Sequence, residues 1–206
     1  MIKSSIGERL DALIHQLFPF LFRRHFDPNA LTVCGALVSL AAAVAFAFGH
    51  FAPGGILMLL GGFFDLVDGV VARHQGSASR FGAFLDSTLD RFVDMVLLLG
   101  ICVHFAARGE AGTVLLAGAA LVASVLVSYA KARAELVLPR FDVGLFERGE
   151  RVGLLAAGAI LGFLVPALWI IVIGSAVTVA QRFAAAYREM ERLDEADRRG
   201  LEENAG

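Results

Sequence analysis

The chain has few cysteines, little net charge and no signal-peptide pattern, and each absence excludes something. Its two cysteines, among 206 residues, both lie in apolar segments, so a disulfide framework is not expected. The formal net charge is −2, which provides no bulk basic surface for nucleic acid. The first 27 residues carry charges throughout and lack the small-residue cleavage site of a signal peptide.

What the chain has in abundance is apolar side chains. Hydrophobic residues make up 57% of the sequence, and the mean hydropathy is +0.70. Soluble domains have only about 45–50% apolar residues. The composition therefore predicts an integral membrane protein.

Six segments are candidates for membrane-spanning helices. They cover roughly residues 29–49, 54–71, 82–106, 113–130, 152–164 and 167–185. The fifth is short, and Pro166 marks the turn to the sixth. The expected fold is an all-α integral membrane protein with six transmembrane helices.

The basic residues indicate how this chain is oriented. Every Lys and Arg except Arg108 lies near the termini, in the loops 72–81 and 131–151, or at the helix ends beside them. Short basic loops stay on the cytoplasmic side. We therefore expect a multi-pass protein of the cell (plasma) membrane with both termini cytoplasmic.

Two polar segments flank the predicted spans. Residues 5–24 place apolar side chains at helical spacing, which is typical of an amphipathic helix on the membrane surface, although Pro19 should bend it. From about Tyr187 the chain is highly charged, and we expect a solvated helix end that becomes disordered. The predicted organisation is a juxtamembrane amphipathic helix (1–27), a membrane domain (28–190) and a charged cytoplasmic tail (191–206).

Four aspartates stand out in this apolar context. Asp65 and Asp68 are three residues apart near the end of the second span, and Asp86 and Asp90 are four apart near the start of the third. Such pairs share a helix face. Because the connection between the spans is short, we expect the two acidic faces to converge.

Converging carboxylates at a membrane edge repel one another, and a divalent cation relieves that repulsion. Oxygen ligands without His or Cys suit Mg²⁺ or Mn²⁺, and four carboxylates suffice for two ions. Gly69, one turn after Asp65, and Gly82, one turn before Asp86, leave room for a ligand, while Arg73 is placed to meet a phosphate. The alternative is a charged loop facing water. For Asp94, a turn deeper, we expect a structural ion pair with an arginine such as Arg91.

The acidic motif also carries a resemblance. Asp65-x2-Asp68-Gly69-x2-Ala72-Arg73-x8-Gly82-x3-Asp86-x3-Asp90 resembles, without gap or substitution, the signature of the CDP-alcohol phosphatidyltransferase family. The resemblance extends over the whole chain, because that family has a surface helix, six spans and cytoplasmic termini. It also implies a homodimer.

The resemblance implies a reaction of phospholipid biosynthesis. A hydroxyl of an acceptor alcohol attacks the lipid-bearing phosphate of a CDP-linked lipid such as CDP-diacylglycerol, and CMP leaves. By similarity, Asp65, Asp68 and Asp86 bind the metal ions, and Asp90, which also touches one ion, is the general base. The implied contacts of the CDP-lipid are Pro28, Asn29, Thr32, Gly69, Arg73 and Ser79. The segment DPNALT (27–32) also fits ordinary helix initiation.

Cations near the cytoplasmic ends suggest that the acceptor is a phosphorylated polyol. Buried cations are costly unless they meet an anion, although the positive-inside bias explains some of them. The expected acceptor-phosphate contacts are Ser128, Lys131, Arg133, Arg148, Arg151 and Arg182. The pattern S-Y-x-K-A-R-A-E, followed by E-R-x-E-R and a late Q-R, resembles the branch that uses inositol 1-phosphate and makes phosphatidylinositol phosphate.

Other functions remain open at this point. Glycerol 3-phosphate is the second choice of acceptor, although Ser87 and Arg91 stand where relatives that use it have Pro and Lys. A divalent-metal transporter would spread acids across the membrane depth, whereas these four lie near one face. An inactive structural relative is disfavoured because the acidic set is complete.

Overall fold

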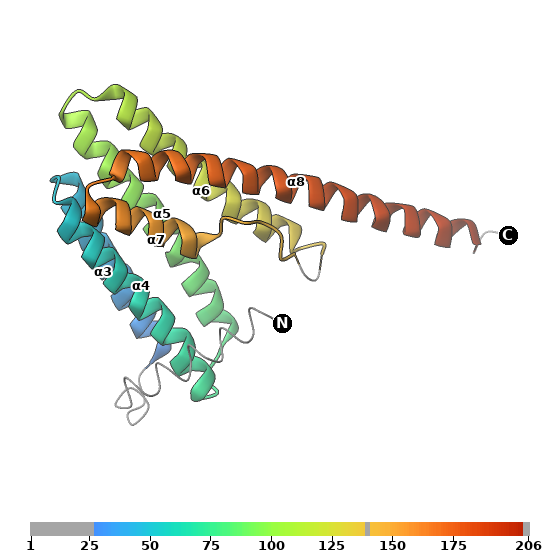
Figure 1. Cartoon of the computed structure of the whole chain (residues 1–206). Helices are drawn as coiled ribbons and strands as arrows, with labels where there is room; N and C mark the ends of the chain where they lie inside the picture. Colours follow the sequence, from blue (N-terminus) through green and yellow to red (C-terminus); the bar gives the residue numbers. More distant parts are fainter. Residues whose placement is uncertain (1–26, 139–140, 204–206) are drawn as a thin grey trace.

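The computed structural model describes residues 27–138 and 141–203, and this part of the chain is all-α (Figure 1). Its helices are α3 (Pro28–Ala47), α4 (Phe51–His74), α5 (Arg80–Ala107), α6 (Ala111–Ala134), α7 (Arg148–Leu161) and α8 (Leu164–Glu203). Each corresponds to one of the six predicted segments. The predicted surface helix at 5–24 lies outside the described residues.

The helices form one bundle. α3 packs against α4 and α5, α6 packs against α5 and α8, and α7 packs against α4 and α8. The hydrophobic core contains fully buried side chains from several of these helices, among them Phe46, Leu97, Ile101 and Leu168. Only the short turn 75–79 separates the end of α4 from the start of α5. The aspartate-bearing parts of the two helices therefore lie toward the same end of the bundle.

Small residues bring α3 close to its neighbours. A Cβ atom added to Gly35 would lie 3.0 Å from the carbonyl oxygen of Gly61 in α4. One added to Gly100 in α5 would clash with the carbonyl oxygen of Ala43. This close packing fixes α3 beside both helices that carry the aspartates.

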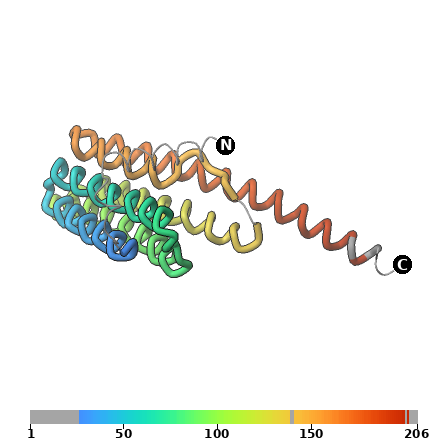
Figure 2. The backbone as a smooth tube through the Cα atoms, turned by 90° about the horizontal axis from the view of Figure 1, so that it is seen from below, coloured from blue at the N-terminus to red at the C-terminus, as the bar shows by residue number. Residues whose placement is uncertain are grey.

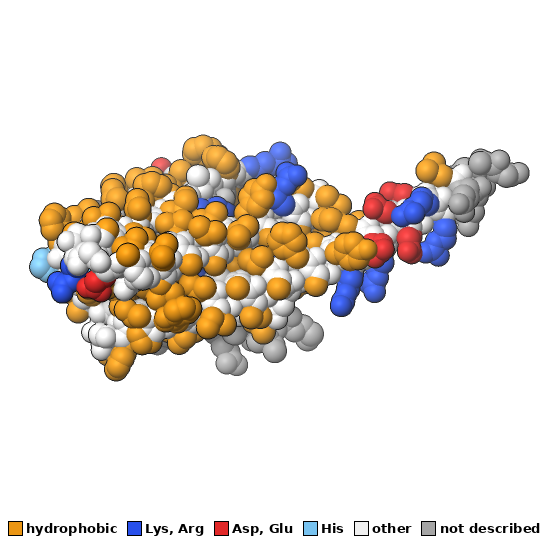
Figure 3. Space-filling view, turned by 90° about the horizontal axis from the view of Figure 1, so that it is seen from above, with side chains coloured by type: hydrophobic (Ala, Val, Ile, Leu, Met, Phe, Trp, Pro, Cys, Tyr) orange, Lys and Arg blue, Asp and Glu red, His pale blue; other side chains and the backbone are white. Residues whose placement is uncertain are grey.

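Four of the described helices, α3, α4, α6 and α8, are long and apolar enough to cross a membrane. α5 has sufficient length, but Asp86, Asp90, Arg91 and Asp94 make its first half polar. α7 has 14 residues, which at about 1.5 Å each give about 21 Å, less than a hydrocarbon core of about 30 Å. The bundle is that of a multi-pass membrane protein, and Figure 3 shows apolar side chains over most of its visible flank.

α8 is longer than the sequence suggested. It continues as helix to Glu203 and projects beyond the rest of the bundle (Figure 2), so the expected helix end after Tyr187 is confirmed and is longer than expected, reaching the last described residue. Alanine, glutamate and arginine favour helix, and exposed ion pairs at helical spacing join Arg192 to Glu189 (2.9 Å) and Arg199 to Glu195 (3.6 Å). Met190 still packs against Ala134, Leu138 and Phe141, and beyond it these local interactions sustain the helix.

Candidate active site

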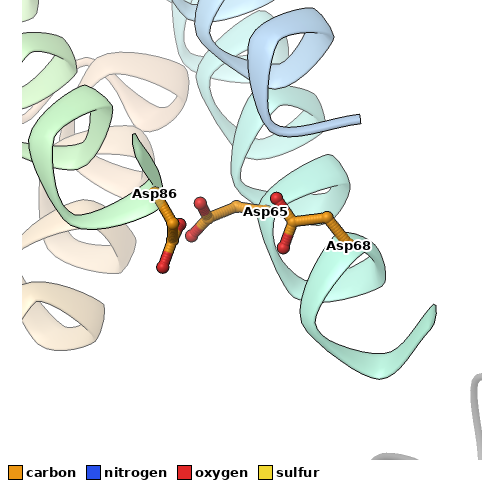
Figure 4. A group of neighbouring side chains, drawn as sticks. All are labelled: Asp65, Asp68 and Asp86. Atoms are coloured by element: carbon orange, nitrogen blue, oxygen red, sulfur yellow. The ribbon is translucent and has the colours of Figure 1, made fainter. Parts of the chain in front are cut away.

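Three of the four predicted metal ligands come together at one end of the bundle. Asp65 and Asp68 project from α4 and Asp86 from α5, and their carboxylates point toward one another (Figure 4). Each contributes an oxygen, and these oxygens lie within 4.8 Å of one another. The expected convergence of two acidic helix faces is confirmed for these three residues, here called the aspartate trio.

Asp68 is the most buried member of the trio, with 5% of its surface exposed. The hydroxyl of Thr32, from α3, donates a hydrogen bond to Asp68 Oδ2. Thr32 is itself buried, so the side chain of Asp68 is held in one orientation. A buried carboxylate needs such partners, and one hydrogen bond leaves further lone pairs for a ligand.

The trio fits a divalent cation. Three carboxylates from two helices surround one point with oxygen atoms only, which is the ligand set that Mg²⁺ and Mn²⁺ prefer. Among the described residues no histidine or cysteine belongs to this group. The geometry therefore supports the predicted metal identity.

Asp90, the fourth predicted ligand, is held differently. Its Oδ1 lies 2.8 Å from Nη1 of Arg148 at the start of α7, and the same nitrogen lies 2.7 Å from Asp65 Oδ2. Arg148 Nε also lies 3.4 Å from Asp94 Oδ1. Burial alone would lower the pKa of the Arg148 guanidinium, but the carboxylates of Asp90, Asp94 and Asp65 raise this pKa above its usual value. Arg148 is thus a permanent cation between the aspartates.

Asp94 forms a structural ion pair, as expected, but not with Arg91. Its Oδ2 lies 3.1 Å from Nη2 of Arg151, of which 4% is exposed. Arg91 instead donates to the carbonyl oxygen of Ser87, one turn earlier in its own helix. Arg91 and Asp94 share a face of α5, but Asp94 pairs across to α7, where Arg148 and Arg151 both reach its carboxylate.

All six predicted CDP-lipid contacts line one cavity of about 280 Å³ beside the trio. These residues are Pro28, Asn29, Thr32, Gly69, Arg73 and Ser79. Two side chains at this cavity also cap helices. The Asp27 carboxylate accepts a hydrogen bond from the backbone amide of Asn29 (2.9 Å), and the Ser79 hydroxyl accepts one from the backbone amide of Gly82 (2.9 Å). The alternative explanation of DPNALT as a helix start therefore holds alongside its place in the cavity.

A second cavity, of about 360 Å³, contains five of the six predicted acceptor contacts. They are Ser128, Lys131, Arg148, Arg151 and Arg182. Asp86 lines both cavities, whereas Asp90 lines only this second one. The two cavities therefore share Asp86 of the trio.

Arg133 is the exception, because it lines a separate, largely apolar cavity with Tyr129 and Tyr187. Two residues along a helix rotate the side chain by about 200°, so Arg133 cannot share the face of Lys131. Sequence reasoning also missed two acids, Glu135 and Glu147, that line the second cavity. Glu135 was detectable from its spacing, since it lies four residues after Lys131 and pairs with it at 3.7 Å.

Known proteins are similar to this chain in sequence and in fold. A sequence model described as CDP-alcohol phosphatidyltransferase matches residues 26–186. The phosphatidylinositol phosphate synthase of Mycobacteroides abscessus is 39% identical over 197 residues, covering 91% of this chain and 89% of that protein.

Two crystal structures of the Mycobacterium tuberculosis phosphatidylinositol phosphate synthase are similar in fold. The one with CDP-DAG bound has a TM-score of 0.73 and 28% identity, covering 89% of this chain and 94% of that one. The complex with manganese and citrate has a TM-score of 0.76 and 31% identity, covering 82% and 86%. The chain is therefore a member of the CDP-alcohol phosphatidyltransferase family.

Proposed function

We propose that this protein transfers the phosphatidyl group of CDP-diacylglycerol to a hydroxyl of inositol 1-phosphate. The products are phosphatidylinositol phosphate and CMP. The observation that carries the proposal is the second cavity, where Lys131, Arg148, Arg151 and Arg182 gather beside the trio. Relatives named phosphatidylinositol phosphate synthase support the same acceptor.

The donor belongs in the smaller cavity. There Arg73 offers a cation to its phosphates. Asp65, Asp68 and Asp86 would hold two Mg²⁺ or Mn²⁺ ions, which when bound neutralise the diphosphate and stabilise its transition-state charge. Gly69 leaves the backbone of α4 open to the nucleotide.

The acceptor belongs in the larger cavity. Arg182 is only 3% exposed, and its Nε donates to the carbonyl oxygen of Val143 at 2.8 Å. Its Nη2 lies 4.0 Å from Glu147 Oε1, and a phosphate monoester would bring a further anion to this buried cation. The cavity's acids, Glu135 and Glu147, can accept hydrogen bonds from polyol hydroxyls.

Asp90 is the proposed general base. It lines the acceptor cavity, one helical turn from the Asp86 of the trio, so it lies between the acceptor and the metal site. Asp90 would take the hydroxyl proton as the oxygen attacks the lipid-bearing phosphorus, and the bond from that phosphorus to the CMP oxygen would break. Every proton and leaving group is then accounted for.

We further propose six membrane crossings, cytoplasmic termini, a cytoplasmic active site and a homodimer. α5 packs between α3 and α6, two helices that are apolar enough to span. A helix enclosed by spanning neighbours can carry polar residues at one end, where they face a water-filled site. The basic residues favour the cytoplasmic side for that end.

The test is CMP release by the purified protein from CDP-diacylglycerol with a panel of acceptors. We expect release with inositol 1-phosphate, dependent on Mg²⁺ or Mn²⁺ and abolished by EDTA. Free inositol should be a poor acceptor, because it has no phosphate for the cations of this cavity to bind. Activity with glycerol 3-phosphate alone would disprove the acceptor assignment.

A further inference from the structure

Arg148 belongs to two sites at once. Its guanidinium contacts Asp65 of the aspartate trio and Asp90, at 2.7 and 2.8 Å. The same side chain lines the cavity that holds Lys131 and Arg182. A single cation therefore stands between the proposed metal site and the proposed acceptor site.

The contact with Asp65 opposes metal binding. Asp65 offers one carboxylate oxygen to the trio, and Oδ2 of the same carboxylate already accepts a hydrogen bond from Arg148 Nη1. A second positive charge close to this guanidinium would be repelled. Arg148 and a divalent cation thus compete for the negative charge of the same carboxylate.

Arg148 has the freedom to leave without moving its helix. It is the first residue of α7, and Arg151, one turn later, anchors that helix through its own pair with Asp94. The Arg148 side chain is 28% exposed, whereas that of Arg151 is 4% exposed. A change in the Arg148 side chain alone would therefore not disturb the packing of α7.

We propose that Arg148 exchanges partners between the two sites. Without a metal ion it neutralises Asp65 and Asp90, and when the trio holds a divalent cation its guanidinium is released to bind the acceptor phosphate. This inference rests on the proposed function for the identity of the ion and of the acceptor. It makes metal binding and acceptor binding mutually dependent.

Linkage sets the size and symmetry of this dependence. If the bound cation strengthens acceptor binding by some factor, the acceptor must strengthen cation binding by the same factor. Couplings of this kind are typically about 5- to 150-fold. The acceptor phosphate would also balance the charge of Arg148 after it leaves Asp65.

The first test measures Mn²⁺ affinity without any acceptor. The free-Mn²⁺ signal in electron paramagnetic resonance is titrated for the full-length purified protein and for Arg148→Gln. We expect Arg148→Gln to bind Mn²⁺ about tenfold more tightly, because the competing cation is gone. Lys131→Gln removes an equal charge from the same cavity, but Lys131 pairs with Glu135 and Asp142, not with the trio. This control should change the affinity much less.

The second test adds inositol 1-phosphate. It should tighten Mn²⁺ binding to the unaltered protein, and this effect should disappear in Arg148→Gln. Two results of the acceptor-free titration would overturn the inference. One is unchanged or weaker Mn²⁺ binding by Arg148→Gln, and the other is an equal gain in Mn²⁺ affinity in Lys131→Gln. The acceptor-free titration does not depend on the acceptor's identity, so its result for Arg148 stands even if the proposed function fails in the CMP assay.

Discussion

At the scale of single residues, the aspartates of the site differ in what surrounds them. Thr32 orients Asp68, Arg148 contacts Asp65 and Asp90, and Arg151 holds Asp94. These four carboxylates are chemically identical, but each has different hydrogen-bond and ion-pair partners. Their proposed division into metal ligands, base and structural partner follows from these neighbours rather than from residue type.

Thr32→Val tests the value of the orienting hydrogen bond. Valine keeps the shape of the side chain but removes the hydroxyl that donates to Asp68. Loss of a partner that orients a metal ligand typically costs about 10- to 100-fold in metal affinity, so we expect Mn²⁺ affinity to fall about tenfold. Thr32→Ser restores the hydroxyl and should bind nearly normally. Full Mn²⁺ affinity in Thr32→Val would show that this contact has no role in metal binding.

The spacing of the aspartates was sufficient to predict the trio, since i,i+3 and i,i+4 pairs on helices joined by a short turn must converge. The ion pairs of Arg148 and Arg151 were not predictable in the same way. They depend on where α7 packs. Arg148 lies 83 residues from Asp65 in sequence, and Arg151 lies 57 residues from Asp94. Local periodicity carries no information about contacts across that separation.

At the scale of helices, the site depends on how closely three of them pack. α3 supplies Thr32, α4 supplies Asp65 and Asp68, and α5 supplies Asp86. Small residues at their contacts let the backbones approach, as is common between helices in membranes. Changes in this packing should therefore affect both stability and the site.

Gly100→Ala should destabilise the bundle. The new Cβ atom would clash with the main-chain carbonyl oxygen of Ala43, so α5 must move away from α3. Overpacking of this kind costs about 1–3 kcal/mol, and the thermal unfolding temperature in a fixed detergent should fall. Gly118→Ala is the control, because its Cβ atom would meet nothing within 4 Å. If both variants unfold at the same temperature, close packing at Gly100 is not important.

The positions of all six described helices could be predicted from runs of apolar residues and the breaks between them. The predicted ability to cross a membrane is supported for α3, α4, α6 and α8, whereas for α5 and α7 it stays a prediction. The predicted fifth span, 152–164, was already short, and α7 has 14 residues because it starts at Arg148 and the left-handed backbone of Gly162 terminates it. A helix end after Tyr187 was predicted, but its length was not, since charge alone does not distinguish an exposed helix from a disordered segment.

At the scale of the whole molecule, the number of crossings decides which side each loop faces. With six crossings, Arg108 lies opposite the active site. If only α3, α4, α6 and α8 crossed, the turn between α5 and α6 would lie on the same side as the 75–79 loop. One exposed position in that turn therefore separates the two topologies.

Arg108→Cys, in a background where Cys34 and Cys102 are replaced by alanine, provides this test. Arg108 is exposed and pairs only with the nearby Glu110 among the interactions described, so the substitution should be tolerated. We expect a membrane-impermeant thiol reagent to label it from outside intact cells. A cysteine at Gln75, the matched control, should be labelled only after the membrane is opened. Labelling of both positions from the same side would contradict six crossings.

The central claim is that three aspartates hold the metal while Asp90 moves the proton, and Asp90→Asn tests it most directly. Asparagine retains the size of the side chain but cannot accept a proton. Paired measurements of CMP release and of Mn²⁺ and CDP-lipid binding should show turnover reduced by about 10²- to 10⁴-fold with binding retained. Asp86→Asn should instead lose Mn²⁺ binding. Near-normal turnover by Asp90→Asn would mean that the base lies elsewhere and would contradict this division of roles.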